Sequence, residues 1–210
     1  QRTLGFAMQS FFIGIGAVLL GVTVGGLLGF FSGWVGRWAD MIVQRFVDIL
    51  MVFPPLILAL IISVVLGRGI MSVVIAIGTY NISQFTRLTR SRVFQEKEQD
   101  YIEAQKALGS SIVRIFAYHL FPNIIAPIFV LASLRVGGAI LTEAALGFLG
   151  FGIQPPTPTL GAIVNEGRNF LVMYPWISLA PGIFIMILVI GFNLLGDGLR
   201  EVLDPRVKKL

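Results

Sequence analysis

The sequence predicts an all-α polytopic membrane protein, organised as one transmembrane domain over residues 1–210. Hydrophobic residues make up 56% of the chain and charged residues 13%, whereas a soluble domain carries about 25% charged residues. Apolar runs of about 20 residues, the length that crosses a bilayer as a helix, also recur along the chain. Five transmembrane helices are expected, over residues 10–32, 46–67, 69–87, 120–144 and 174–196.

These spans differ in how cleanly apolar they are. Residues 11–31 and 49–66 contain no charge, and neither do residues 69–85, a run of marginal length. The fourth run is interrupted once, by Arg135, and the fifth is free of charge. All five therefore satisfy the composition of a membrane helix.

The first span carries Gly21, Gly25, Gly29 and Gly33, each four residues apart. This spacing places them along one face of a helix, where the missing side chains allow another backbone to approach closely. We expect this face to pack within the same bundle, with a contact to a partner subunit as the alternative.

The second and fourth spans contain three candidates for lining a transport pathway. Pro54 and Pro55 each remove a backbone donor, so the helix is expected to kink or unwind there, beside protein or a watery cavity. A simple kink fits the pattern equally well. Arg135 is the third candidate, because a charge inside a span is costly and is usually functional or paired. Glu143 is too far along the helix to pair with Arg135 and is expected at the outer water boundary.

The basic residues predict the orientation of the chain. Alternation of the spans places twelve Lys and Arg residues on one face and three on the other, and the basic face is assigned to the inside. The chain then starts outside and ends inside, which predicts a further span before Gln1. Basic residues spread over three loops are ordinary topology determinants, so no nucleic-acid partner is expected. The inner residues are Arg37, Arg45, Arg87, Arg90, Arg92, Lys97, Lys106, Arg114, Arg200, Arg206, Lys208 and Lys209. The outer residues are Arg2, Arg68 and Arg168.

Two connections are too long to be simple turns. The outer connection, residues 147–174, is rich in Gly and Pro but also in apolar side chains, which predicts an ordered and partly re-entrant cap. The inner connection, residues 88–119, contains strong helix formers over 95–108, with acids near the start and Gly109 at the end. Ser110 or Ser111 then caps a second short helix.

The surface of this inner helix predicts its role. Tyr101, Ala104 and Leu108 fall on one face, and Ala104 and Ala107 leave room for another surface to approach. An amphipathic helix lying on the bilayer would carry Trp or Phe anchors, which this helix lacks. A docking surface for a cytoplasmic partner is the favoured interpretation.

The chain carries few groups suited to catalysis. It has no cysteine and one histidine, His119, which cannot form a zinc site alone. It also lacks the G-x-x-x-x-G-K-[ST] sequence of a P-loop. We therefore expect no enzyme activity, metal or cofactor in this chain.

Several motifs resemble a known family. Glu103-Ala104-Gln105 followed by Gly109, and then residues 119–122 (HLFP), resemble the "EAA…G…LP" signature of the permease subunits of ABC importers. Residues 141–164 and 194–206 resemble the C-type permeases of dipeptide, oligopeptide and nickel importers. Gln105 and Phe121 depart mildly from the usual alanine and leucine.

This resemblance implies a fold and a set of partners. The family has a six-helix core, so the first span is missing here, and residues 88–119 hold a coupling helix. A second homologous permease, two cytoplasmic ABC ATPases that bind ATP and Mg²⁺, and an extracytoplasmic solute-binding protein are implied in a bacterial or archaeal cytoplasmic membrane. The residues expected to contact the ATPase are Tyr101, Glu103, Ala104, Ala107, Leu108 and Gly109.

Di- or oligopeptides are the expected solute, with nickel, glutathione and oligosaccharides as alternatives within the same architecture. A secondary transporter or channel would show inverted repeats or ligands for a coupling ion, and neither is visible. A membrane-embedded enzyme would need acids, histidines or a Ser/Lys pair that converge within the membrane. The spans supply almost none of these.

Overall fold

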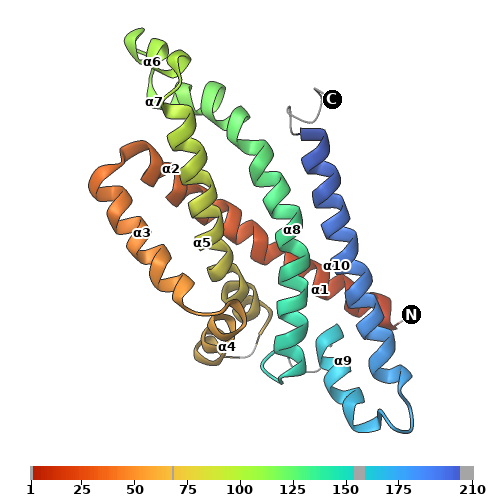
Figure 1. The fold of residues 1–210 in the computed structure, drawn as a ribbon. Coiled ribbons are helices and arrows are strands. Elements are labelled where there is room, and N and C mark those ends of the chain that lie inside the picture. Colours follow the sequence, from red (N-terminus) through yellow and green to blue (C-terminus); the bar gives the residue numbers. More distant parts are fainter. Residues whose placement is uncertain (1, 68, 154–158, 204–210) are drawn as a thin grey trace.

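The computed structural model describes residues 2–67, 69–153 and 159–203, and the regular secondary structure in these ranges is helical (Figure 1). The basic residues Arg68, Arg206, Lys208 and Lys209 and part of the outer connection lie outside the described residues. The helices are α1 (Arg2–Leu20), α2 (Gly26–Val35), α3 (Arg37–Val52), α4 (Pro55–Leu66), α5 (Ile70–Lys97), α6 (Asp100–Ala107), α7 (Ile112–Ile115), α8 (Phe121–Phe148), α9 (Leu160–Gly167) and α10 (Trp176–Leu203). Two π-helical turns, Gly21–Gly25 and Phe116–Leu120, join α1 to α2 and α7 to α8, and a 3₁₀ turn, Arg168–Phe170, follows α9.

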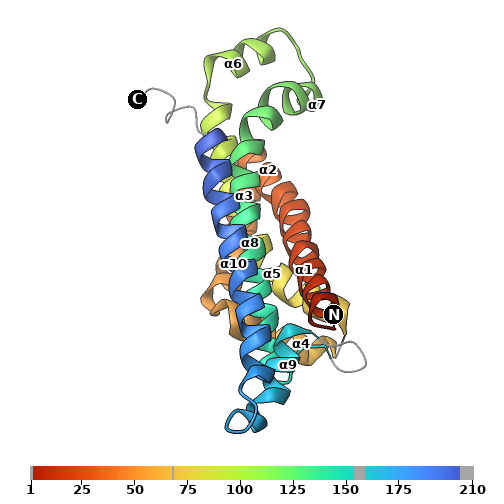
Figure 2. The ribbon, with the colours of Figure 1, turned by 90° about the vertical axis from the view of Figure 1, so that its right-hand side faces the viewer.

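The long helices form an elongated bundle with two distinct ends (Figures 1 and 2). Helices α6 and α7 project from one end, which we call the α6 end. Helix α9 lies at the opposite end, the α9 end, together with the start of α1. Helix α10 extends from the α9 end toward the α6 end, alongside α8.

Several helices are suited to a membrane. By length and apolar composition, Gly5–Val35, Ile112–Phe148 and Trp176–Leu203 can each cross one, and α3 with α4 gives a fourth if this bent pair is a single span. Helix α5, which contains the expected span 69–87, is not among them, since polar Thr, Asn, Ser and Gln residues interrupt its apolar stretch. The protein is therefore a multi-pass helical membrane protein, and a total of five spans remains a prediction.

The glycine face of α1 and α2 packs against α5. A Cβ placed on Gly25 would lie 2.5 Å from the carbonyl oxygen of Ile82, and one on Gly29 would lie 2.5 Å from that of Thr86. A Cβ on Gly33 would lie 2.9 Å from the Cβ of Val93. The expected packing within one bundle is thus confirmed, and the glycines set how closely the two helices approach.

The expected second span, 46–67, is not one helix. Helix α3 already begins at Arg37, and the chain bends by 94° between α3 and α4. Pro54 has extended backbone angles, and Pro55 starts α4 at a position where a missing N–H costs nothing. The proline pair therefore breaks the segment rather than kinking it.

Two boundaries near the inner connection also differ from expectation. Helix α5 continues to Lys97 instead of ending near 87, because the polar residues that follow the apolar run are good helix formers. The single helix expected over 95–108 is wrong: the chain is extended at Gln99, and α6 starts afresh at Asp100. This break allows α6 to run across the end of the bundle before the chain returns toward it at α7 (Figure 2).

The described part of the outer connection contains α9. Gly150, with φ +81°, follows α8, and the Thr159 side chain caps the N-terminus of α9 by accepting from the Ala162 amide at 3.5 Å. Gly161 packs against the backbone of Ala144 on α8 without room for a Cβ. Helix α9 therefore packs closely against the α9 end of α8.

Candidate functional site

One buried side chain attaches α6 to the rest of the molecule. Ile102 is fully buried and forms a small apolar cluster with Ile115 and Leu120, against which Trp34 and Phe116 pack. Ile102 is not predictable from the sequence around it, because its burial depends on residues more than ten positions away. Burial of this one side chain fixes which face of α6 is turned toward the bundle.

Polar contacts orient the start of α6. The Tyr101 hydroxyl donates to the Glu96 carboxylate and accepts from Asn123 Nδ2 at 3.1 Å. Partial burial of the phenol, reinforced by the neighbouring Glu96 carboxylate, raises the pKa of Tyr101 to about 12. Tyr101 therefore links the end of α5 to the start of α8 as a neutral donor at physiological pH.

A Schellman motif ends α6. The Ser110 amide donates to the Gln105 carbonyl at 3.1 Å, and the Gly109 amide donates to the Lys106 carbonyl at 3.0 Å. Gly109 has φ +74°, in the left-handed region that glycine adopts without strain. The predicted end of the helix at Gly109 is confirmed, and Ser111 caps α7 by accepting from the Arg114 amide at 3.4 Å.

The six residues predicted to contact a partner are all exposed. The predicted docking face of Tyr101, Ala104 and Leu108 is exposed, with Leu108 at 78%. The residue of α6 that packs on the bundle is Ile102. The exposed residues on α6 and its turn are Tyr101, Glu103, Ala104, Ala107, Leu108 and Gly109.

Two lysines connect this region to the end of α2. Lys97 donates from Nζ to the Trp34 carbonyl at 2.7 Å. Lys106 lies with Nζ 5.3 Å from the centre of the Trp34 ring, a distance at which a cation is attracted to the aromatic face. Trp34 is therefore in contact with both sides of the break between α5 and α6.

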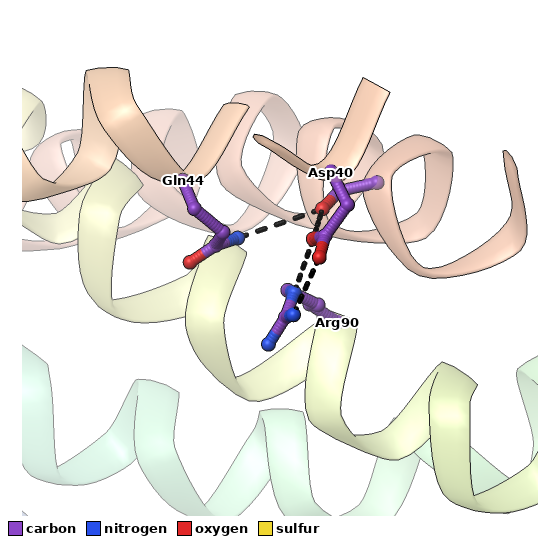
Figure 3. Close-up of polar contacts among 4 residues, drawn as sticks. Asp40, Gln44 and Arg90 are labelled. Carbon is purple, nitrogen blue, oxygen red and sulfur yellow. Dashed lines mark hydrogen bonds and ion pairs between the residues drawn. The ribbon is translucent and has the colours of Figure 1, made fainter. Parts of the chain in front are cut away.

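A polar cluster joins α2, α3 and α5 near the α6 end (Figure 3). Arg90 of α5 donates from Nη2 to Asp40 Oδ2 at 2.6 Å and from Nε to Oδ1, which gives a bidentate ion pair. Ser32 Oγ donates to the same carboxylate at 2.6 Å, and Gln44 lies beside it. This cluster was not predicted, since nothing local in the sequence indicates that charges 50 positions apart will meet.

The structure separates the pathway candidates. Pro54 and Pro55 are exposed at the α3–α4 break. Arg135, near the middle of α8, donates from Nη2 to Gln84 Oε1 of α5 at 2.8 Å, and its guanidinium lies 5.8 Å from the Tyr80 ring centre. Among the described residues, the hydrogen bond and the ring contact of Arg135 are made with α5 and not with either proline.

Glu143 is not at a water boundary. Its side chain is fully buried on α8, and neither carboxyl oxygen makes a hydrogen bond of normal geometry to a described residue. The expectation from sequence was wrong because α9 covers this end of α8.

The described residues contain no group of three or more acidic or histidine side chains that could hold a metal ion. A shallow depression of about 330 Å³ lies beside α6 and is lined by Gln105, Arg114, Tyr118 and His119. Its position next to the exposed residues of α6 makes this end of the molecule the strongest candidate for contact with a partner.

Comparisons with known proteins show which family the chain belongs to. The sequence profile of the family described as "binding-protein-dependent transport system inner membrane component" matches residues 25–209. The chain is 45% identical over 198 residues to the dipeptide transport system permease protein DppC of Alkalihalophilus pseudofirmus, covering 94% of this chain and 64% of DppC. It is 40% identical over 195 residues to the glutathione transport system permease protein GsiD of Pectobacterium atrosepticum, covering 93% and 65% respectively. The chain thus spans just under two thirds of these relatives' length.

The fold is also shared with a solved structure. An inward-facing structure of the MetNI methionine ABC transporter contains a chain that matches with a TM-score of 0.70 at 18% identity, covering 96% of this chain and 94% of that one. At this identity, the match shows a common fold.

Proposed function

The chain belongs to the family of binding-protein-dependent transport system inner membrane components, and we propose that it is the permease subunit of an ATP-driven importer for di- or oligopeptides. The identity to a dipeptide permease supports the solute class. Glutathione, itself a short peptide, is the second candidate, because a glutathione permease is 40% identical.

The proposed complex contains a second homologous permease, two cytoplasmic ABC ATPases and an extracytoplasmic solute-binding protein. ATP and Mg²⁺ bind to the ATPases, since this sequence contains no P-loop. Pro54, Pro55 and Arg135 line the pathway between the two permeases.

The proposed topology has five spans in a bacterial or archaeal cytoplasmic membrane, with the N-terminal end of the chain outside and the C-terminal end inside. The basic residues of the inner connection support this orientation. So does the arrangement of the helices, since the α6 end receives that connection together with the end of α10 (Figure 1). Helix α5 is then the third span, and α3 with α4 is the second.

The observation that carries the proposal is the exposure of one whole face of a well-anchored helix. The outer face of α6 carries Glu103, Ala104 and Ala107, while Ile102 holds the opposite face in the bundle. A small-residue surface of this kind fits into a groove on a partner, and its charges set the register of docking.

The contacts of α6 also provide a mechanical connection. Closure of the ATPases would displace α6, and the displacement would reach α5 through the short link at Gln99 and α8 through Ile115 and Leu120. The long helices would then rock between inward-open and outward-open arrangements. Residues 88–119, the coupling loop, are thus the part of the chain through which ATP hydrolysis drives transport.

A charge reversal tests this contact. Glu103→Lys places a cation on the docking face, and we expect loss of ATPase co-purification and at least a tenfold loss of ATP-dependent peptide uptake, while the permease stays in the membrane. Glu166→Lys is the matched control, because Glu166 is also an exposed acid, on α9 at the other end. Normal ATPase co-purification with Glu103→Lys, or equal loss with Glu166→Lys, would overturn the docking surface.

A further inference from the structure

Arg135 belongs to a three-residue polar group between α5 and α8. Its Nη2 donates to Gln84 Oε1 at 2.8 Å, and Gln84 Nε2 donates in turn to the Tyr80 hydroxyl oxygen at 3.2 Å. The guanidinium also lies 5.8 Å from the centre of the Tyr80 ring. All three side chains are half-buried, so the chain itself leaves them partly accessible.

The group carries a positive charge that no carboxylate of the described residues balances. The two ion pairs within residues 2–67, 69–153 and 159–203 are Arg87–Asp48 and Arg90–Asp40, and neither involves Arg135. Glu143 follows Arg135 on α8 by roughly 12 Å along the helix axis and is fully buried. The partners of Arg135 on α5 are neutral.

An arginine near the middle of a membrane helix is costly and usually faces an interior cavity and an anionic partner. The guanidinium has N–H groups beyond the one donated to Gln84, in the planar arrangement that binds a carboxylate through two parallel hydrogen bonds. The Tyr80 hydroxyl accepts from Gln84, so its own proton is available to a second acceptor. The contacts among the three side chains hold these donors next to one another between α5 and α8.

We propose that Arg135, Gln84 and Tyr80 form a transient binding site for the carboxylate of the transported solute. This inference rests on the proposed function as a peptide permease. Every unmodified linear peptide presents a C-terminal carboxylate, so such a site would serve peptides that differ in their side chains. It would also offset the cost of moving an anionic group past the middle of the bilayer.

The test compares a dipeptide with its C-terminal amide in the intact, reconstituted complex. Dialanine and dialanine amide are the probes, and the measured quantity is the ratio of their ATP-dependent uptake rates. A permease variant leaves the solute-binding protein unchanged, so a change in this ratio reports on the permease alone. We expect Arg135→Gln to lower the acid-to-amide ratio about tenfold and Arg135→Lys to stay within about threefold of the wild type, since Lys keeps the charge.

Arg87→Gln is the matched control, because Arg87 lies one helical turn from Gln84 on α5 but is already paired with Asp48 at 2.6 Å. The control should leave the ratio unchanged. An unchanged ratio in Arg135→Gln, an equal fall in Arg87→Gln, or loss of complex assembly in Arg135→Gln would each overturn the carboxylate site. Acidic dipeptide amides carry a carboxylate on the side chain but none at the C-terminus, so they test which carboxylate is bound. If the site binds the terminal carboxylate, Arg135→Gln leaves the uptake of these amides unchanged. Absence of ATP-dependent uptake of all these peptides by the wild-type complex would instead contradict the proposed function.

Discussion

The contact of α2 with α5 and the turn after α6 both depend on glycine, but for opposite physical reasons. Gly29 lies within a helix without a positive φ, and glycine is required there for space, because the carbonyl oxygen of Thr86 lies 2.5 Å from the position of a Cβ. Gly109 has open space around its Cβ position and is required for its φ of +74°. The first region is a closed internal surface, whereas the second holds an exposed helix in a fixed position.

The difference shows what each region is built for. Two backbones that touch along a glycine face move together, since no side chains lie between them to rearrange. Helix α6 instead depends on one buried isoleucine, a capped end and a few polar contacts. It is therefore held by fewer and more separate contacts than the glycine face.

The largest expected effect comes from adding a side chain at Gly29, where α2 packs against α5. Gly29→Ala forces a methyl group against the Thr86 carbonyl and should lower the free energy of unfolding by about 1–3 kcal/mol, as overpacking does elsewhere. Gly26→Ala is the matched control, because nothing lies within 4 Å of its Cβ position. Alanine at position 26 should be neutral or slightly stabilising, since it favours helix over glycine. Denaturation of the detergent-solubilised protein measures both.

Equal stability of the two alanine variants would contradict the idea that the glycine face is an internal surface. A selective loss of complex assembly in Gly29→Ala, without a loss of stability, would assign the face to a partner subunit instead.

These two regions also show what could be read from sequence. The glycine face and the turn at Gly109 were both predicted correctly, because each depends on a pattern within a few residues: a four-residue spacing in one case and a helix end in the other. The proline break before α4 is local in the same sense, although the size of the bend was not predictable.

Features that depend on distant residues were missed. The burial of Ile102 requires Ile115 and Leu120 to come together beneath it, and the pair of Asp40 with Arg90 requires α3 to lie against α5. The buried side of α6 could not be predicted for the same reason, since the helix carries apolar side chains on more than one side. Periodicity identifies the faces of a helix but does not determine which of them meets the bundle.

A smaller effect is expected at the exposed turn. Gly109→Ala places an L-residue in the left-handed region, at a cost of about 1–2 kcal/mol, whereas Gly109→Asn should be tolerated better because asparagine adopts this region more readily. The loss should be confined to the end of α6. Hydrogen exchange at the Ser110 amide, which donates to Gln105 at 3.1 Å, should therefore accelerate in Gly109→Ala and stay slow in Gly109→Asn.

Global destabilisation of Gly109→Ala, as large as that of Gly29→Ala, would remove the distinction between the two regions. It would mean that α6 is an integral part of the bundle instead of a separately anchored element.

The smallest expected effect concerns the pH dependence of the α6 anchor. The Tyr101 pKa, about 12 in the folded protein, exceeds the value of about 10 for a free tyrosine, so the folded state holds the phenolic proton more tightly. The resulting stabilisation is fully present below pH of about 10 and is lost as the pH rises toward about 12. Tyr101→Phe should remove this alkaline loss, and near neutral pH it should cost only the hydrogen bonds of the phenol with Glu96 and Asn123.

The ultraviolet absorbance of tyrosinate follows this titration directly, as the difference between wild type and Tyr101→Phe in the intact complex. A midpoint of this difference titration near pH 12 supports the contacts of Tyr101 with Glu96 and Asn123. A midpoint near pH 10 would show that the phenol is free in water and that α6 is held by Ile102 alone. In that case α6 would pivot about a single side chain, and the contrast with the glycine face would be sharper than the structure indicates.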